Sequence, residues 1–311
     1  MSEDQIDLAR REFLKRLGLL VVLAGVGHRW VLPEALWAMA PASRPQPLVA
    51  QASGSSWDQI TGEALQKLGG LKKFVHPGET VVIKPNMSFD RTPEQGANVH
   101  PLVVRQVVAL CLEAGAKEVK VFDHPALDPR LSYKVSGIED AVRGLKDPRA
   151  QVVYADPRDF VPVVAERARN LKKWWYYREA LTADRFINIA VAKHHSSAGL
   201  TMCLKNMMGA IGGNRPSLHP NLAQNIADMN LILRPDLHLL DATRIMVRNG
   251  PFGGRLEDVE VRNLVFAGPD PVALDAVGTT LFGKQPSDIP HILKAHQHQL
   301  GELDLAKIKL L

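Results

Sequence analysis

The stretch from residue 79 to residue 125 decides the fold. It contains three patterned pieces, ETVVIKPN (79–86), HPLVVRQVVALCLEAGA (100–116) and KEVKVFDHP (117–125). The first and third pieces are short apolar runs bounded by turn residues, a pattern typical of buried strands. The middle piece repeats apolar residues at helical spacing and stops at Gly115. Because parallel strands need a crossover between them, strand, helix and strand in this order predict a βαβ unit.

The same two patterns alternate through the rest of the chain. We expect further helices at 57–68, 138–145, 197–211, 221–233, 271–282 and 287–299, and further strands at 150–156, 184–193, 236–243 and 261–268. The sequence therefore predicts an α/β fold, with a mostly parallel sheet flanked by helices in a Rossmann-like layered architecture.

Polar clusters follow four of the predicted strands. Ligands bind outside the carboxyl ends of the strands in open α/β sheets, so these clusters are the candidate site. They are IKPN with Lys84 and Asn86, AKHHSSAGLT with Lys193, His194 and Ser197, LDATRIMVRNGPFGG with Asp241 and Asn249, and FAGPDPVALDAVG with Asp270 and Asp275.

Several of these residues also have a purely structural interpretation. The predicted helix start near Ser197 would offer free N–H groups to an anion, and Lys193 would add positive charge. His194 could donate or accept a proton there, or be a histidine without a chemical role. Asp270 precedes Pro271 and could simply cap a helix, and Asp241 could be a turn or cap residue.

Lys205 and Asn206 lie in the Met-rich run that follows the second cluster. Apolar residues surround Lys205 at helical spacing, so its amine would be partly desolvated. A buried ammonium needs a partner or loses its proton, which makes Lys205 a candidate base or Schiff-base former. The alternative is a lysine that extends its amine from a core helix to solvent.

Composition limits the class of protein. The chain has 311 residues, 46% of them hydrophobic, and a net charge of +5. Its basic residues are spread along the chain without an arginine run, which disfavours nucleic-acid binding and allows a mild preference for anionic ligands. Its two cysteines, Cys111 and Cys203, cannot hold an iron–sulfur cluster, although a disulfide between them stays open.

The N-terminus indicates export. The segment ARREFLKRLGLLVVLAGVG (9–27) places an arginine pair before an apolar run that is too short to span a bilayer, and RREFLK resembles a twin-arginine signal. Residues 41–56 look like a flexible leader, with cleavage after Ala40 or near Ala50 or Ala52. We therefore expect a leader over 1–52, a single domain over 53–311, passage through the twin-arginine translocase, a periplasmic location and no stable membrane insertion. The alternative is an amphipathic N-terminal helix.

Four blocks of the sequence resemble the family called domain of unknown function 362 (DUF362). They are residues 81–125, FINIAVAKHHSSAGLTMCLKNMMGAIGG (186–213), LHLLDATRIMVRNGPFGG (237–254) and LVFAGPDPVALDAVGTTLFG (264–283). Many members carry ferredoxin-like cysteine clusters, and this chain departs from them. The resemblance implies a single site formed by Lys84, Asn86, His194, Lys205, Asn206, Asp241, Asn249 and Asp275.

These observations lead to one main hypothesis: an exported α/β protein that binds a small anionic ligand or cofactor, with the question whether it is an enzyme, and of which reaction, left open. Lys84, Lys205 and the helix start near Ser197 would hold the anion. His194 would transfer a proton, and Asp241 would orient it or bind a cation.

Two other hypotheses stay open. The chain could be a non-catalytic accessory partner of an exported redox enzyme, since many relatives are redox proteins. It could also hold a metal ion through histidine and aspartate side chains, namely His194, His195 and Asp241 with His219 or His238.

Overall fold

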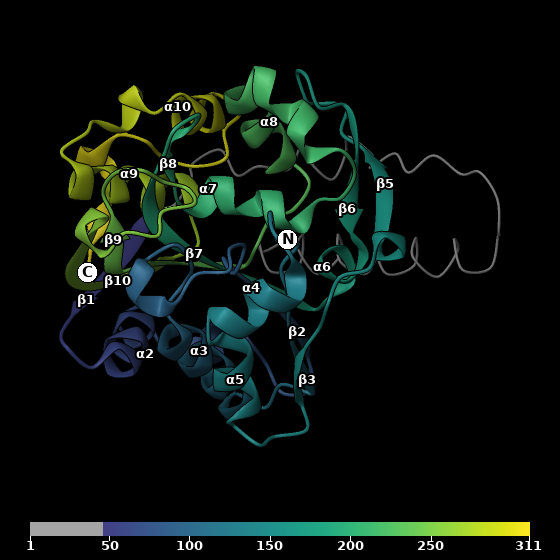
Figure 1. Cartoon of the computed structure of the whole chain (residues 1–311), viewed down its shortest axis with the longest axis vertical. Helices are drawn as coiled ribbons and strands as arrows, with labels where there is room; N and C mark the ends of the chain where they lie inside the picture. Colours follow the sequence, from purple (N-terminus) through teal and green to yellow (C-terminus); the bar gives the residue numbers. More distant parts are fainter. Residues whose placement is uncertain (1–45) are drawn as a thin grey trace.

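The computed structural model describes residues 46–311, and the predicted export signal lies outside them. Within these residues a nine-stranded sheet has the order β11-β1-β10-β9-β7-β2-β3-β4, and β8 pairs with β7 (Figure 1). The strands are β1 (Leu48–Ser53), β2 (Thr80–Pro85), β3 (Glu118–Val121), β4 (Ala150–Val152), β7 (Arg185–His195), β8 (Gly199–Thr201), β9 (Leu237–Met246), β10 (Val259–Gly268) and β11 (Lys309–Leu310).

Five neighbouring strands of this sheet, β9, β7, β2, β3 and β4, run parallel. The β2–β3 pair is the βαβ unit predicted from residues 79–125, with Val81 opposite Val119. Strand β10 runs antiparallel to β9 and to β1. The predicted α/β fold with a mostly parallel sheet is confirmed.

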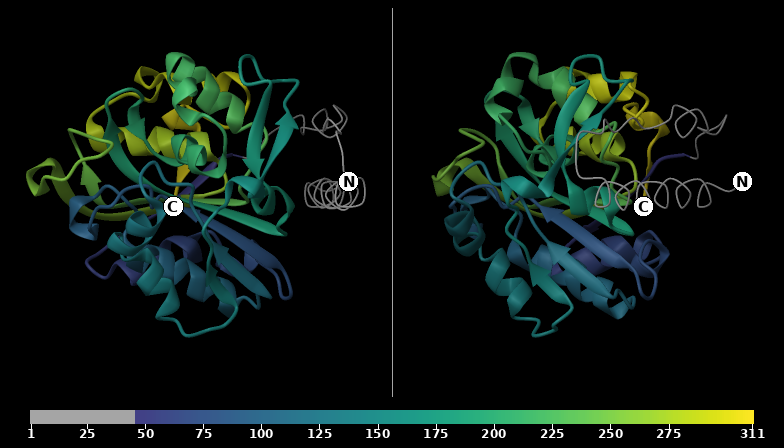
Figure 2. Two further views of the ribbon diagram at one scale, coloured as in Figure 1. Left: turned by 45° about the vertical axis from the view of Figure 1, so that its right-hand side comes forward. Right: turned by 90° about the vertical axis from the view of Figure 1, so that its right-hand side faces the viewer.

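Helices cover both faces of the sheet (Figure 2). On one face lie α2 (Trp57–Lys67), α3 (Pro101–Glu113), α4 (Pro129–Val135) and α5 (Ile138–Arg143), and on the other lie α7 (Cys203–Asn206), α8 (Leu222–Met229), α9 (Pro271–Thr279) and α10 (Pro290–Gln297). The short α6 (Arg178–Thr182) follows a separate hairpin of β5 (Phe160–Val164) and β6 (Lys173–Tyr177). We call the two sides the α3 face and the α7 face.

The central strand β7 shows why both faces are closed. Ile187, Ile189 and Val191 pack into the core cluster on the α3 face, whereas Ala190 and Ala192 pack into the cluster on the α7 face. Successive side chains of a strand point to opposite faces, so a strand buried on both sides has an almost continuous apolar sequence.

Two predicted elements are wrong. Residues 48–53 are not a flexible leader: they form β1, and Val49 and Ala50 are fully buried beside β10. The predicted helix over 197–211 is replaced by β8, the one-turn helix α7 and a 3-10 turn at Met207–Ala210. The chain reverses after His195 because Gly199 adopts a positive φ of 75° and pairs back with β7.

Three smaller points complete the fold. Asp270 caps α9 by accepting hydrogen bonds from the N–H groups of Val272 and Ala273, as its structural interpretation predicted. Cys111 and Cys203 are both buried free thiols, so the disulfide left open by the sequence is not formed. In the part of the chain that the structure describes, the helices are too short or too polar to cross a bilayer.

Candidate functional site

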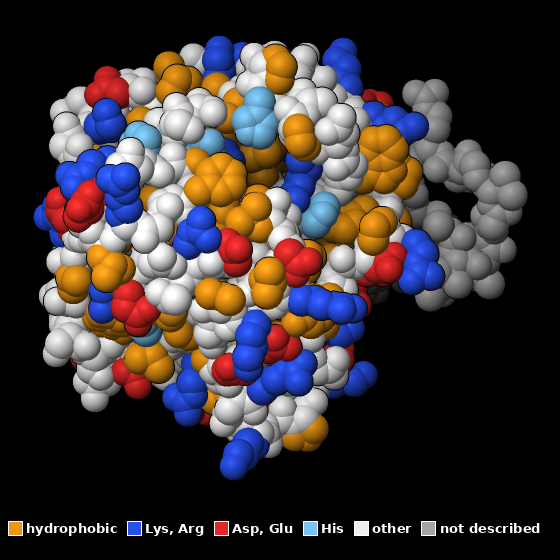
Figure 3. All heavy atoms as spheres, viewed as in Figure 1, with side chains coloured by type: hydrophobic (Ala, Val, Ile, Leu, Met, Phe, Trp, Pro, Cys, Tyr) orange, Lys and Arg blue, Asp and Glu red, His pale blue; other side chains and the backbone are white. Residues whose placement is uncertain are grey.

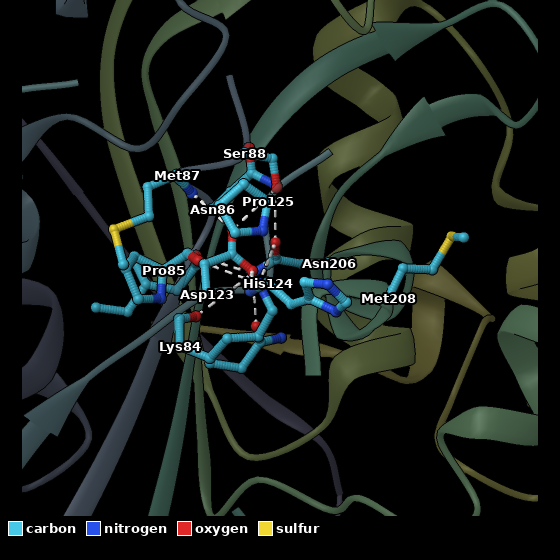
Figure 4. Close-up of polar contacts among 12 residues, drawn as sticks. Lys84, Pro85, Asn86, Met87, Ser88, Asp123, His124, Pro125, Asn206 and Met208 are labelled. Atoms are coloured by element: carbon cyan, nitrogen blue, oxygen red, sulfur yellow. Dashed lines mark hydrogen bonds and ion pairs between the residues drawn. The ribbon is translucent and has the colours of Figure 1, made fainter. Parts of the chain in front are cut away.

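A buried ion pair joins the ends of β2 and β3. The amine of Lys84, the penultimate residue of β2, lies 2.8 Å from Oδ1 of Asp123, and both side chains are 0% exposed (Figure 4). The same amine donates hydrogen bonds to Oδ1 of Asn206 and to the carbonyl of Pro85, each at 3.0 Å. Burial lowers the pKa of Lys84, and the charge of Asp123 acts in the opposite direction.

The Asp123 carboxylate is fully hydrogen-bonded. Its Oδ2 accepts the N–H of Met87 at 3.0 Å and the hydroxyl of Ser88 at 2.9 Å, and its Oδ1 accepts the N–H of His124 at 3.0 Å. Gly209 closes the pair from the α7 face, because a Cβ atom there would lie 1.8 Å from Oδ1 of Asp123. A charged pair without solvent is stable only when its remaining hydrogen-bonding groups are satisfied, as they are here.

The Asn206 side chain connects this pair to β7. Its Oδ1 also accepts a hydrogen bond from Nδ2 of Asn86 at 2.9 Å, and its Nδ2 donates to Oδ1 of Asn188 at 2.8 Å and to the carbonyl of Ile189 at 3.0 Å. The amine of Lys193 donates to Oδ1 of Asn86 at 3.0 Å. Four predicted residues, Lys84, Asn86, Lys193 and Asn206, are thus in one buried network.

Lys193 has no carboxylate among its hydrogen-bond partners in the described residues. Besides Asn86, its amine donates to the carbonyl of Ala97 and lies 4.4 Å from the centre of the Phe89 ring. Burial lowers the pKa of Lys193 well below its ordinary value, and Lys205 and Lys84 lower it further.

Lys205 differs from the other lysines of the site. Its side chain is 9% exposed, and within residues 46–311 its amine has neither a hydrogen-bond acceptor nor an ion-pair partner. Burial lowers the pKa of Lys205 to about 8, and the charges of Arg215 and Lys84 contribute to the decrease. Among the described residues, the site therefore contains a desolvated amine without a partner.

The position of Lys205 is fixed by its neighbours in α7. Asp275, a fully buried residue of α9, accepts the N–H of Cys203 at 2.7 Å and the N–H of Leu204 at 3.0 Å. Nδ2 of Asn230 donates to the carbonyl of Leu204 at 3.0 Å. Burial raises the pKa of Asp275 to about 7, although the two N–H bonds act against this increase. Asp275 therefore positions the helix and does not line the site itself.

The charge of Lys205 acts on the imidazole of His195, the residue after the predicted His194. Nδ1 of His195 accepts the N–H groups of Ser197 and Ala198 at 3.1 and 3.2 Å, which places the ring hydrogen on Nε2. Burial lowers the pKa of His195 to about 3, with Lys205 the next largest cause. His195 is therefore a neutral ring with an N–H donor at Nε2, whereas Nδ1 of His194 accepts the N–H of Gly250 at 3.1 Å.

A second buried imidazole adjoins this region. His291, near the start of α10, is 1% exposed, and its Nε2 has no hydrogen-bond partner in the described structure. Burial lowers the pKa of His291 to about 3, and Lys205 lowers it further. A buried ring nitrogen without a hydrogen bond costs free energy.

Three predicted residues lie elsewhere. Asp241 is on the α3 face, where it accepts the N–H of His100 at 2.7 Å and binds Thr243, because β9 alternates its side chains between the two faces. Asn249 donates to Asp258 at 2.8 Å in the β9–β10 connection. Ser197 is exposed in the β7–β8 turn, so the predicted helix start at Ser197 is wrong.

The alternative metal site is also not assembled. Among residues 46–311 no three His, Cys, Asp or Glu side chains are placed so that they could hold a metal ion. Of its proposed ligands, Asp241 binds the His100 backbone and His238 lies beside Nδ2 of Asn188 at 3.0 Å.

Sequence reasoning missed two charged residues of the site. Asp123 follows the predicted strand in KVFDHP, so the same strand-end pattern that identified Lys84 also applied to it. No sequence pattern points to Arg215. Its guanidinium donates to the backbone carbonyls of His124, Pro125 and Met208, and every residue type has such a carbonyl.

The site is electropositive. Lys84 has a carboxylate partner, but the hydrogen bonds of Lys193 and Arg215 end on neutral oxygens, and Lys205 has none in the described residues. Figure 3 shows histidine, lysine and arginine side chains around a hollow on the side of the molecule that carries α7 and α8. Such an arrangement favours a bound anion, because positive charges in a low-dielectric site lack compensation.

Comparison with known proteins gives a family and several similar chains. The sequence model described as "Domain of unknown function (DUF362)" matches residues 81–280. A thylakoid-associated protein of Synechocystis sp. is 29% identical over 252 residues, which cover 76% of this chain and 73% of that protein.

Two solved structures are similar at 16% identity. One is a Thermotoga maritima protein, with a TM-score of 0.41 over 79% of this chain and 60% of that chain. The other is the lactate racemase apoprotein of Thermoanaerobacterium thermosaccharolyticum, with a TM-score of 0.38 over 74% of this chain and 57% of that chain. This chain thus spans less than two thirds of either solved chain.

Proposed function

We propose a function for this chain from its own site, because it belongs to the DUF362 family, a family described only as a domain of unknown function. The protein binds a small anionic ligand next to Lys205, on the α7 face, where β2, β3 and β7 end. Lys205 makes the direct ionic contact. His195 donates a hydrogen bond through Nε2, and Lys84, Lys193 and Arg215 supply positive potential from positions fixed by their own hydrogen bonds.

One observation carries this proposal: the buried amine of Lys205 has no partner within residues 46–311. Burying an unpaired charge is unfavourable by several kcal/mol, and natural folds usually pair such a group or replace it. The cost is offset if an anion binds Lys205 in the functional state. A ligand that binds only the folded protein stabilises it in proportion to the logarithm of its concentration.

A panel of anions measured by thermal unfolding tests the proposal. Small monocarboxylates, dicarboxylates, phosphate and sulfate are added to the wild type, to Lys205→Met and to the control Lys117→Met, which removes an exposed lysine. We expect at least one anion to raise the Tm of the wild type and of the control but not that of Lys205→Met. The proposal fails if no anion stabilises the wild type, or if Lys205→Met responds equally.

We also propose that the chain is exported through the twin-arginine route, on the basis of the RREFLK segment. Cleavage then follows Ala40 and not Ala50 or Ala52, because a cut at either of the last two would divide β1, whose Val49 is fully buried. Cell fractionation of the wild type and of the double variant Arg10→Lys, Arg11→Lys tests export. Retention of both forms in the same fraction argues against it, and the mass of the exported chain locates the cut.

A further inference from the structure

We propose that Lys205 is a nucleophile as well as an anion-binding group, and that its amine forms an imine with the carbonyl carbon of a small 2-oxo acid. This inference rests on the proposed function, because the carboxylate of the 2-oxo acid is the anion that the site attracts. It extends that function by naming a class of ligand and a covalent step.

The helix that carries Lys205 is held in place, whereas the amine of Lys205 is free in the described structure. The N–H groups of the two residues before Lys205 bind Asp275, and the side chain of the next residue, Asn206, makes hydrogen bonds to Lys84, Asn86 and Asn188. The lysine side chain between these bonds has no partner of its own in the described residues. A reacting group needs this arrangement, in which its backbone is held while its reactive atom is available.

The protonation state of the amine also favours attack on a carbonyl carbon. Only the neutral amine can attack a carbonyl, and a lysine is activated when it is desolvated or lies next to another cation. Both conditions hold for Lys205, which is 9% exposed and is affected by the charges of Arg215 and Lys84. The carboxylate of Asp275, which contacts the backbone of α7, already accepts two backbone N–H groups. Burial and these charges lower the pKa of Lys205 to about 8, so a substantial fraction of the amine is neutral near pH 7 to 8.

Two neutral imidazoles, those of His195 and His291, add hydrogen-bonding groups to this region. His195 carries its ring hydrogen on Nε2 and can donate a hydrogen bond, without losing that hydrogen, to the carbonyl oxygen as negative charge develops there; the hydrogen that the oxygen gains comes from the attacking amine. His291 has a buried Nε2 that finds no hydrogen-bond partner within residues 46–311. Both rings stay neutral near pH 7, because burial lowers the pKa of each to about 3.

The step balances without an oxidant or a reductant. Nζ of Lys205 forms a bond to the carbonyl carbon, and the carbonyl oxygen gains a hydrogen to give a carbinolamine. The oxygen then leaves as water with both hydrogens of the amine, and a C=N bond remains. Because the imine nitrogen can be protonated, the positive charge that holds the carboxylate is kept. The low exposure of Lys205 favours a ligand of a few carbon atoms.

Reductive trapping with pyruvate tests this inference. Wild-type protein is incubated with pyruvate and sodium cyanoborohydride, and the mass of the intact chain and of its peptides is measured. We expect one adduct per chain, on the peptide that contains Lys205. Labelling of Lys205 should exceed that of the exposed Lys117 on the order of tenfold or more, because an ordinary lysine with a pKa near 10.4 is almost entirely protonated at pH 7.

Two variants separate the imine from simple anion binding. Lys205→Arg keeps a positive charge but cannot form an imine, so pyruvate should still raise its Tm although no adduct forms. Lys205→Met should lose both responses. If pyruvate stabilises the wild type but cyanoborohydride traps nothing on Lys205, the imine is refuted and anion binding stands. If pyruvate and the other anions have no effect on the wild type, both proposals fail.

Discussion

Replacement of Lys205 by methionine should stabilise the unliganded protein. Methionine is similar to lysine in length, but it carries no charge, and its flexible side chain fits an irregular apolar site. Lys205 contributes no hydrogen bond or ion pair in the described structure, so the substitution removes an unfavourable charge and leaves no partner behind. Most substitutions of buried residues destabilise a protein, which makes a gain here diagnostic.

The size of the gain follows from the pKa. Burial, Arg215 and Lys84 together lower the pKa of Lys205 from 10.5 to about 8. Since each pKa unit corresponds to about 1.4 kcal/mol, the charged amine costs about 3 kcal/mol at pH 7. The expected increase in the free energy of unfolding lies between about 1 and 3 kcal/mol, because imperfect packing of the methionine reduces it.

The gain should also depend on pH, with a defined sign. Between about pH 8 and 10.5 the amine of Lys205 is protonated in the unfolded chain but neutral in the folded one. The unfolded state then binds more protons, so the wild type becomes more stable as the pH rises through this window. The cost is complete below pH 8, and the advantage of Lys205→Met should disappear by about pH 10.5. Lys84, Lys193 and Asp275 also titrate near this amine, but they are present in both proteins and largely cancel in the difference.

Urea unfolding of the two proteins at pH 7 and pH 10, without added anions, measures the effect. Lys84→Met is the matched contrast: it strands the buried carboxylate of Asp123 and should cost about 3–5 kcal/mol. If Lys205→Met is destabilised to a similar extent, the amine of Lys205 has a partner and the reasoning is wrong. A gain that is the same at both pH values would equally contradict it, because the effect would then come from packing.

Three further changes have defined outcomes. Asp275→Asn should cost about 1–3 kcal/mol in urea unfolding and weaken anion binding, since an amide can accept only one of the two N–H bonds that position α7. Gly209→Ala should destabilise the protein by more than about 2 kcal/mol, because its Cβ would overlap Asp123. The control is Gly62→Ala in helix α2, where the atom nearest to the new Cβ would be 3.5 Å away, and it should be neutral or stabilising by up to about 1 kcal/mol. Deletion of residues 1–52 should lower the free energy of unfolding by at least about 2 kcal/mol compared with deletion of 1–40, since it removes the buried Val49 of β1; equal stability of the two chains would contradict this.

The parallel core of the fold could be predicted because each of its strands is buried on both faces. Such strands are nearly continuous apolar runs, and the helix between β2 and β3 has a clear helical period. β1 could not be found in the same way. Its sequence, LVAQAS, is short and lies among proline, serine and alanine residues, and it is fixed by pairing with β10 about two hundred positions away.

Most of the site residues that could be predicted from the sequence lie at or near the ends of the predicted strands. The strand-end rule identified Lys84, Asn86 and Lys193 correctly as neighbours, and the Met-rich run led to Asn206. The strand-end rule could not distinguish His194 from His195. The positive φ of Gly199 determines how the chain turns back after β7, and the predicted helix over 197–211 does not contain this turn.

The buried polar residues in and after the strands divide between the two faces of the sheet, and this division separates structural roles from a functional one. On the α3 face Asp241 binds the backbone of His100 and the Thr243 side chain, so its charge is used to join β9 to the start of α3. On the α7 face Asp123 is similarly occupied by Lys84 and three hydrogen-bond donors. Within residues 46–311, Lys193 and Arg215 donate hydrogen bonds to neutral oxygens, whereas the amine of Lys205 has neither a hydrogen-bond acceptor nor an ion-pair partner. Folds retain locally unfavourable groups chiefly where function requires them, so the exception is where a ligand is expected.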